Sequence, residues 1–373
     1  MPESARILAF PSRAAKASLS AEDALTAARE YVRELIEEPS SKPAPTVLDH
    51  PETTLALLTL FKDLIEKAPS EVGGASEDLY GSLQRSSKGI GLFDEKDYIL
   101  GELARYCAWA HRLCGNFDEA ERWLDRAEAG YRHTLNPGPL LANVSYARLA
   151  IRYERRQHAH VLDLAPSLIA SFEKLGMTGE AFKARFLRSV TLKAAGQEAE
   201  AFEEYCQLRD DLRHGADLSL LGQVMVHIGE IHGGQGRFEE ALQSYRHALS
   251  VLGAGGRPIV LAELKWNIGS TYRALGSLDV AVKAYREARV DYQSLGMTVF
   301  AALVGLSIAD TLLTMSRPRE AEWEILAAMP AIEEAKLGSE IQAATALLAE
   351  SVRQKKTDPK ALSELRELLS KAS

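Results

Sequence analysis

A 40-residue repeat constrains the fold of this chain more than any other feature. The segments Phe172–Thr178 and Tyr292–Thr298 are near-identical and lie 120 residues apart, which is three periods of 40. The same period recurs in five alanines at 40-residue steps: Ala201, Ala241, Ala281, Ala321 and Ala361. Four residues after each alanine stands a large side chain: Tyr205, Tyr245, Tyr285, Ile325 and Leu365. The repeat predicts an array of similar units that stack to bury a continuous core.

Each unit has the pattern of two helices joined by a tight turn. In the clearest unit, small or apolar residues recur at helical spacing from Trp266 to Ala288 and are interrupted once, at Gly276. Gly276 can adopt the left-handed conformation that ends a helix, and Gly269 lets a neighbouring helix approach closely. Tyr285 then fills the space between the two helices. Because no segment has a convincing strand pattern, we predict an all-α fold.

This pattern resembles the tetratricopeptide repeat (TPR), a helical hairpin marked by an aromatic residue, Leu-Gly, Tyr, Gly-x-Tyr/Phe, Ala, Phe/Tyr and Ala in order. Two consecutive units carry the resemblance most fully, with Ile228, Gly229, His232, Gly236, Phe238, Ala241, Tyr245 and Ala248 in one, and Trp266, Gly269, Tyr272, Gly276, Leu278, Ala281, Tyr285 and Ala288 in the next. The resemblance implies a right-handed superhelical α-solenoid of about seven long-period hairpins over residues 99–373. Its degenerate last unit, with a polar outer face, is expected to be a capping helix.

The first 90 residues lack the glycine and alanine marks of the repeat. Amphipathic periodicity predicts helices over Ala21–Glu38 and Pro51–Lys67, so we expect residues 19–95 to form an amino-terminal helical bundle packed on the first repeat. Proline and glycine content predicts linkers at Pro39–Pro45 and Pro69–Ala75. Residues 1–18 are expected to be disordered.

Charge and cysteine content narrow the classes of partner. The chain has 44 Lys plus Arg against 52 Asp plus Glu, a formal net charge of −8, which argues against binding nucleic acid or anionic membrane. Three cysteines, no signal-peptide core and no apolar run approaching the ~18 residues of a membrane span favour a cytoplasmic protein. We therefore expect a protein or peptide partner. The sequence does not decide whether the chain forms homo-oligomers.

No motif predicts catalysis or a cofactor. Neither a nucleophile elbow nor a phosphate-binding glycine loop occurs. Cys107, His111 and Cys114 would share one helical face, but they lack a fourth ligand and coincide with packing positions of the repeat. We therefore predict a non-enzymatic protein without a metal. An enzyme that uses the groove as a substrate channel is the least favoured alternative.

In a stack of such hairpins, the first helices line a concave groove. Repeat position places thirteen candidate binding residues there: Arg105, Trp109, Arg112, Arg148, Phe186, Lys193, His227, Glu230, Glu263, Trp266, Asn267, Arg273 and Asp310. Aromatic and arginine anchors beside polar groups suit a peptide or a partner helix. The resemblance implies that the Asn267 amide holds a ligand backbone; the alternative is that it bridges neighbouring helices. The carboxylate clamp of chaperone-binding repeats is not matched, because Val226 and Trp266 stand where lysine is expected.

These observations favour a non-catalytic adaptor or regulator that captures a peptide segment or partner helix in the groove. The plan of a helical amino-terminal part followed by many repeats also resembles bacterial multi-repeat tetratricopeptide proteins. Among them, peptide-responsive regulators join a three-helix bundle to six or seven repeats. That resemblance implies an alternative function, a peptide-switched regulator whose bundle moves when ligand binds.

Overall fold

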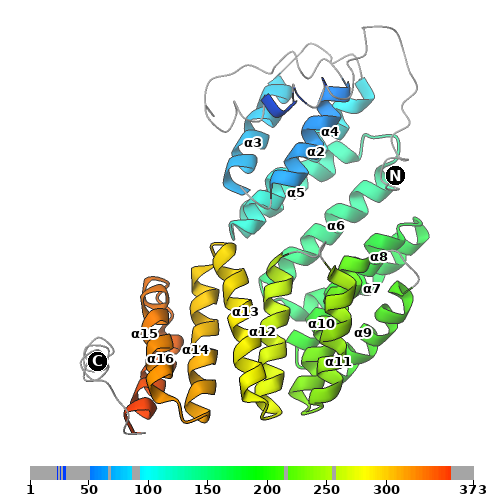
Figure 1. Ribbon diagram of the computed structural model, residues 1–373. Helices are drawn as coiled ribbons and strands as arrows, with labels where there is room; N and C mark the ends of the chain where they lie inside the picture. Colours follow the sequence, from blue (N-terminus) through cyan, green and yellow to red (C-terminus); the bar gives the residue numbers. More distant parts are fainter. Residues whose placement is uncertain are drawn as a thin grey trace. The chain divides into compact units, whose positions relative to one another are not determined.

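The structure is a computed structural model that describes residues 23, 26, 28–30, 51–65, 69–85, 93–213, 217–253 and 258–353. These residues form helices and short turns, with no strand among them. They belong to two compact units, Met1–Ala184 and Arg185–Ser373 (Figure 1). The expected disordered segment 1–18 and the expected linker 39–45 lie outside the described residues, as does most of the helix expected over 21–38, whose described members are helical.

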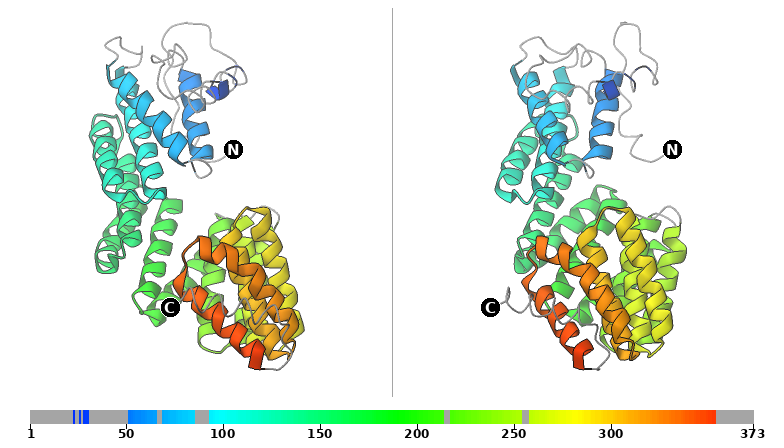
Figure 2. Two further views of the ribbon diagram at one scale, coloured as in Figure 1. Left: turned by 90° about the vertical axis from the view of Figure 1, so that its left-hand side faces the viewer. Right: turned by 60° about the vertical axis from the view of Figure 1, so that its left-hand side comes forward.

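The first unit begins with helices that share one core. Leu57 and Phe61 of α2, Leu79 of α3, and Leu103 and Tyr106 of α4 are all buried in it. Figure 2 shows these helices in blue to cyan. The helices of this unit are α2 (Pro51–Leu64), α3 (Pro69–Arg85), α4 (Phe93–Leu113), α5 (Phe117–Tyr131), α6 (Pro137–Glu154), α7 (His158–Lys174) and the start of α8. The amino-terminal helices therefore pack directly on α4, the first helix of the first hairpin.

The predicted linker at Pro69–Ala75 is wrong, because these residues open helix α3. Pro69 occupies the first helical position, where a missing backbone N–H costs nothing. Gly73 faces α4 so closely that a Cβ atom built on it would lie 2.7 Å from the Cβ of Ala110. The glycine therefore allows close helix packing, a role that composition alone does not distinguish from flexibility.

The second unit is a row of helical hairpins with a regular period. Its helices are α8 (Thr178–Ala194, from Arg185 onward), α9 (Glu198–Leu212), α10 (Leu218–Gly234), α11 (Phe238–Leu252), α12 (Pro258–Ala274), α13 (Leu278–Ser294), α14 (Thr298–Thr314), α15 (Pro318–Glu334) and α16 (Gly338–Arg353). Helices α8, α10, α12 and α14 start 40 residues apart, and the helix after each starts 20 residues later. The predicted period and the predicted helix-turn-helix unit are confirmed.

The turn inside each hairpin ends the first helix in the same way. Gly276 has φ +77°, and its N–H donates to the carbonyl of Arg273 at 3.0 Å. The N–H of Ser277 donates to the carbonyl of Tyr272 at 2.9 Å, which completes a Schellman motif. The equivalent turn before α15 uses Ser316 at φ +57°, a conformation that a residue with a Cβ adopts only at a cost.

A small residue on the first helix faces a large one on the second. A Cβ atom on Gly269 would lie 2.6 Å from Cδ1 of Tyr285, and one on Gly229 would lie 2.5 Å from Cε1 of Tyr245. Both tyrosines are at most 3% exposed, and Ala281 is fully buried. The sequence-based roles of Gly269 and Tyr285 are thus confirmed. In the part of the chain that the structure describes, no helix is long and apolar enough to cross a membrane.

Candidate binding surface

In the second unit, side chains of neighbouring first helices are joined in a ladder. Lys193 of α8 pairs with Glu230 of α10, Glu230 with Asn267 of α12, and Arg273 of α12 with Asp310 of α14. The members of each pair are 37 residues apart, which is one period minus about one helical turn. Predicted groove residues therefore contact one another between three successive pairs of first helices: α8 and α10, α10 and α12, and α12 and α14.

Glu230 is the centre of this ladder. Its Oε2 atom accepts from the Lys193 ammonium and lies 3.0 Å from Nδ1 of His227, and its Oε1 atom accepts from Nδ2 of Asn267 at 3.3 Å. Burial by itself would raise the pKa of Glu230. The hydrogen bonds and charges of His227 and Lys193 outweigh burial and lower the pKa to about 2. The carboxylate is therefore ionised at neutral pH.

An aromatic group flanks the ladder. The imidazole of His227 stacks on Tyr205 with ring centroids 5.3 Å apart and planes 14° apart, and it also contacts the ring of Phe186 at 5.4 Å. Phe186 and Tyr205 are themselves 6.1 Å apart. These contacts fix the orientation of His227, so that its Nδ1 atom is directed to Glu230.

Trp266 and Glu263 lie on α12 beside the ladder. The indole N–H of Trp266 donates to Oγ of Ser307 on α14 at 3.1 Å, and its ring meets Tyr292 edge to face at 6.2 Å. Glu263 is exposed; partial desolvation of its carboxyl and the nearby charge of Glu230 raise its pKa. Trp266 is thus anchored, whereas Glu263 faces solvent next to a second carboxylate.

The predicted groove residues of the first unit have different surroundings. Arg105 pairs with Glu102 at 2.6 Å, and Trp109 packs against the amino-terminal core. Arg112 pairs across to Glu154 of α6. Arg148 binds carboxylates of α5, which is a second helix, at 3.3, 2.6 and 2.6 Å: Glu121, Asp125 and Glu128. Arg112 therefore pairs with a residue of the next first helix, α6, whereas Arg148 pairs with residues of the second helix α5.

Sequence reasoning missed a buried polar network in α4 and α5. The hydroxyl of Tyr131 donates to Oε1 of Glu102 at 2.5 Å, and Arg105 binds the same carboxylate through Nε and Nη2. Burial raises the pKa of Glu102, but Arg105 and Tyr131 more than compensate and the pKa is lowered. The three-residue spacing of Glu102 and Arg105 is a signal that could have indicated this pair; nothing in the sequence pointed to Tyr131.

The cysteine and histidine side chains that the sequence places on one helical face have separate surroundings. Cys107 is buried, whereas Cys114 is exposed and lies 3.6 Å from the hydroxyl of Ser70. His111 is directed to Glu77 of α3, with Nε2 and Oε1 2.7 Å apart. Within the described ranges, no group of three or more His, Cys, Asp or Glu could hold a metal ion.

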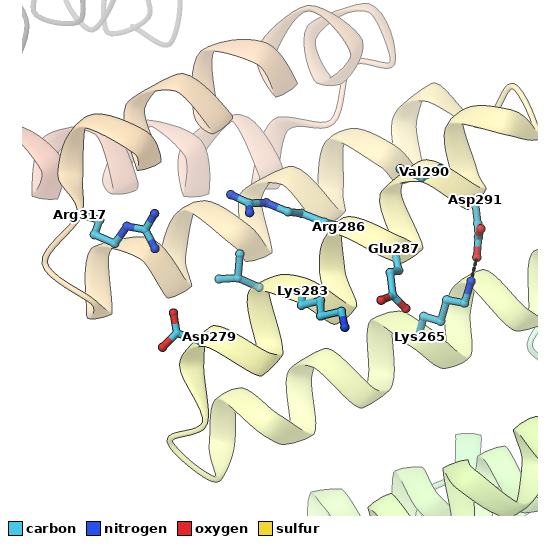
Figure 3. Close-up of a pocket in the computed structure, with 9 residues that line it drawn as sticks. Lys265, Asp279, Lys283, Arg286, Glu287, Val290, Asp291 and Arg317 are labelled. Carbon is cyan, nitrogen blue, oxygen red and sulfur yellow. Dashed lines mark hydrogen bonds and ion pairs between the residues drawn. The ribbon is translucent and has the colours of Figure 1, made fainter.

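A separate open recess of about 540 Å³ lies against α13 (Figure 3). It is lined by charged side chains of both signs and two valines: Lys265, Asp279, Val282, Lys283, Arg286, Glu287, Val290, Asp291 and Arg317. Lys265 and Asp291 pair at 2.5 Å. Most of these residues lie on the second helix α13, so the recess is distinct from the ladder on the first helices. Substitutions here can therefore serve as controls for substitutions in the ladder.

Comparison with known proteins identifies the repeat. A family model described as tetratricopeptide repeat matches residues 222–251 and 262–288, and a second model with the same description matches residues 108–139. No curated protein matches the sequence significantly.

Solved structures with this fold match nearly the whole chain. A Rap protein complexed with Competence and Sporulation Factor has a TM-score of 0.54 and 13% identity, covering 93% of this chain and 99% of its own. The Rap conjugation gene regulator of plasmid pLS20, in complex with the Phr* peptide, has a TM-score of 0.54 and 15% identity, with 94% of each chain covered. A signal transduction ATPase with a tetratricopeptide repeat sensor from Pyrococcus horikoshii has a TM-score of 0.58 and 14% identity, covering 94% of this chain and 53% of its own. The hairpins that contain residues 108–139, 222–251 and 262–288 thus match tetratricopeptide repeats, and the chain as a whole has the fold of a tetratricopeptide-repeat protein.

Proposed function

We propose that the protein is a non-catalytic regulator or adaptor that binds a peptide segment along the first helices α8, α10, α12 and α14. The observation that carries this proposal is the row of polar and aromatic side chains on these helices, centred on Glu230, His227 and Asn267. Tetratricopeptide repeats present their first helices as an extended binding surface. Aromatic anchors beside hydrogen-bonding groups are typical of sites that hold peptides.

The chemistry of the row suits an extended peptide. Nδ2 of Asn267 donates to Glu230, which leaves the side-chain carbonyl oxygen as an acceptor for a ligand backbone N–H. Ser270, one turn further along α12, and exposed Glu263, one turn before, offer further polar contacts on the same face. Asn267 thus combines the two sequence-based interpretations: it bridges neighbouring helices and keeps one atom for a ligand.

A second candidate function is a peptide-switched regulator. Two of the similar solved structures are a Rap protein with Competence and Sporulation Factor and a Rap regulator with the Phr* peptide, and the likeness covers both units of this chain. Under this alternative, bound peptide changes the distance between the two units, whereas a simple adaptor leaves it unchanged. Spin labels on exposed Arg122 and Lys283, with their distance measured with and without a selected peptide, distinguish the two.

A displayed library of short random peptides tests the proposal. Wild type is expected to enrich a common sequence pattern, and an Asn267→Ala, Glu263→Ala double variant is expected to lose it. Lys283→Ala, on the recess-bearing helix α13, is the matched control and is expected to bind as wild type does. Equal retention of the selected peptides by wild type and the double variant, both with native helical content, would contradict binding at this row.

A further inference from the structure

Three hydrogen-bonding groups from three different first helices converge on one carboxylate. The ammonium of Lys193 comes from α8, the imidazole of His227 from α10 and the amide of Asn267 from α12. Ammonium, imidazole and amide N–H groups arranged around two oxygens are the set that recognises a carboxylate ligand. Here the carboxylate belongs to the chain itself, because it is the side chain of Glu230.

We propose that Lys193, His227 and Asn267 form a carboxylate-binding site that Glu230 fills from within the chain, and that Glu230 thereby determines specificity by excluding ligands with a carboxylate at this place. The exclusion of acidic ligands rests on the proposed peptide-binding function. The existence of the site does not, because it follows from the contacts around Glu230 alone.

The side chains around the Glu230 carboxylate are accessible enough for another anion to take its place. The side chains of Lys193, His227 and Glu230 are 31%, 25% and 25% exposed, so a small anion can reach them from solvent. The charged and titratable groups that face Glu230 are Lys193 and His227, with Glu263 and Tyr245 also close enough to interact with it electrostatically. Glu263 adds a second negative charge near Glu230. The positive charge of the site therefore balances one bound carboxylate, and a further carboxylate would be repelled.

Chemical rescue with formate tests the site without any peptide. Glu230→Ala leaves the Lys193, His227 and Asn267 groups without their acceptor, and added formate is expected to occupy the vacated place. The expected result is a saturable rise in Tm with sodium formate that sodium chloride at the same ionic strength does not reproduce. Wild type and Glu230→Gln, whose amide still fills the space, are the matched controls and are expected to respond equally to both salts.

Two further variants complete the test. A Lys193→Met, Glu230→Ala double variant is expected to lose the response to formate, because the cation that binds the anion is gone. Glu230→Ser, whose hydroxyl retains one acceptor, replaces Glu230→Ala if the alanine variant does not fold. A formate response in wild type as large as in Glu230→Ala or Glu230→Ser overturns the proposed site. So does the lack of a response in a folded Glu230→Ala or Glu230→Ser variant.

The peptide library separates this inference from the proposed function. Glu230→Ala is expected to enrich peptides with Asp, Glu or a free carboxyl terminus that wild type rejects. A formate response without such enrichment supports the site and overturns its role in specificity. Failure of every variant and of wild type to enrich any peptide counts against the proposed function and leaves the formate result to decide the site.

Discussion

Substituting Gly229 with alanine tests the packing inside the hairpin of α10 and α11. Gly229 faces Tyr245 so closely that the added Cβ would lie 2.5, 2.7 and 2.9 Å from three ring carbons. Carbon atoms in contact need at least about 3.4 Å, so either the ring or helix α10 must move by nearly 1 Å. Tyr245 is only 3% exposed, so its ring has little space into which it can turn.

The expected free-energy change is the balance of two opposing effects. Overpacking a well-packed core costs about 1–3 kcal/mol, and the tight fit of Tyr245 favours the upper part of that range. Replacing glycine by alanine inside a helix stabilises the helix by about 1 kcal/mol. The net destabilisation is therefore about 2 kcal/mol, equivalent to a decrease in Tm of about 4–8 °C for a unit of this size.

Gly234 provides a matched control in the same helix. No atom lies within 4 Å of a Cβ built there, and Gly234 is exposed, so Gly234→Ala is expected to stabilise the unit by about 0.5 kcal/mol. Urea unfolding followed by circular dichroism measures both variants. Adding Tyr245→Leu, which removes the ring, is expected to recover part of the loss in the Gly229→Ala background. A Gly229→Ala variant as stable as Gly234→Ala would refute the close approach of the two helices.

Three further predictions follow from the turns, the ladder and the first unit. Ser316 has φ +57°, so Ser316→Gly is expected to stabilise the chain by about 0.5–1 kcal/mol in urea unfolding, whereas Gly276→Ser at the equivalent turn lowers stability. The pKa of Glu230 is about 2 in the folded chain, below its value near 4.3 when unfolded; its stabilisation is therefore fully present above about pH 4.3 and is lost as the pH falls toward 2. Unfolding free energies at pH 7, 4 and 2 are expected to show a decrease of at most about 3 kcal/mol from this group, which Glu230→Gln removes. Arg148→Ala, which breaks three ion pairs with α5, is expected to cost about 1 kcal/mol without changing the peptides that the protein selects.

The repeat architecture could be predicted from sequence because each unit needs the same small residues at the same positions. Gly276 needs a positive φ, Gly269 needs space for Tyr285, and both requirements recur at 40-residue steps where a pattern search detects them. Gly73 occurs outside any repeat, so the same residue type gave no indication whether it marked a turn or a close helix contact. The linker predicted there was wrong for that reason.

The contacts of the candidate groove residues were less predictable, because repeat position specifies a face of a helix but not the partner of a side chain. Lys193 and Asp310 were selected by position, yet each forms an ion pair with a residue of the neighbouring first helix. Arg148 was selected by the same rule and pairs with carboxylates of α5 instead. Which of these outcomes occurs depends on the charges one period away, and those charges differ from one repeat to the next.

Such a ladder changes how affinity at the proposed peptide-binding surface should be interpreted. A ligand that contacts Lys193, Arg273 or the amide N–H group of Asn267 does not meet a free polar group, because each of these donors is already paired within the chain. Binding therefore exchanges one hydrogen bond or ion pair for another, and the net gain is smaller than the contact would give in isolation. The ladder also links consecutive first helices, so a ligand that displaces Glu230 loosens contacts from α8 to α12 together. Under the proposed function, selectivity then depends on the contacts that a ligand breaks as much as on those that it makes. Glu230 takes part in three such contacts, so a single substitution there is expected to change selectivity most.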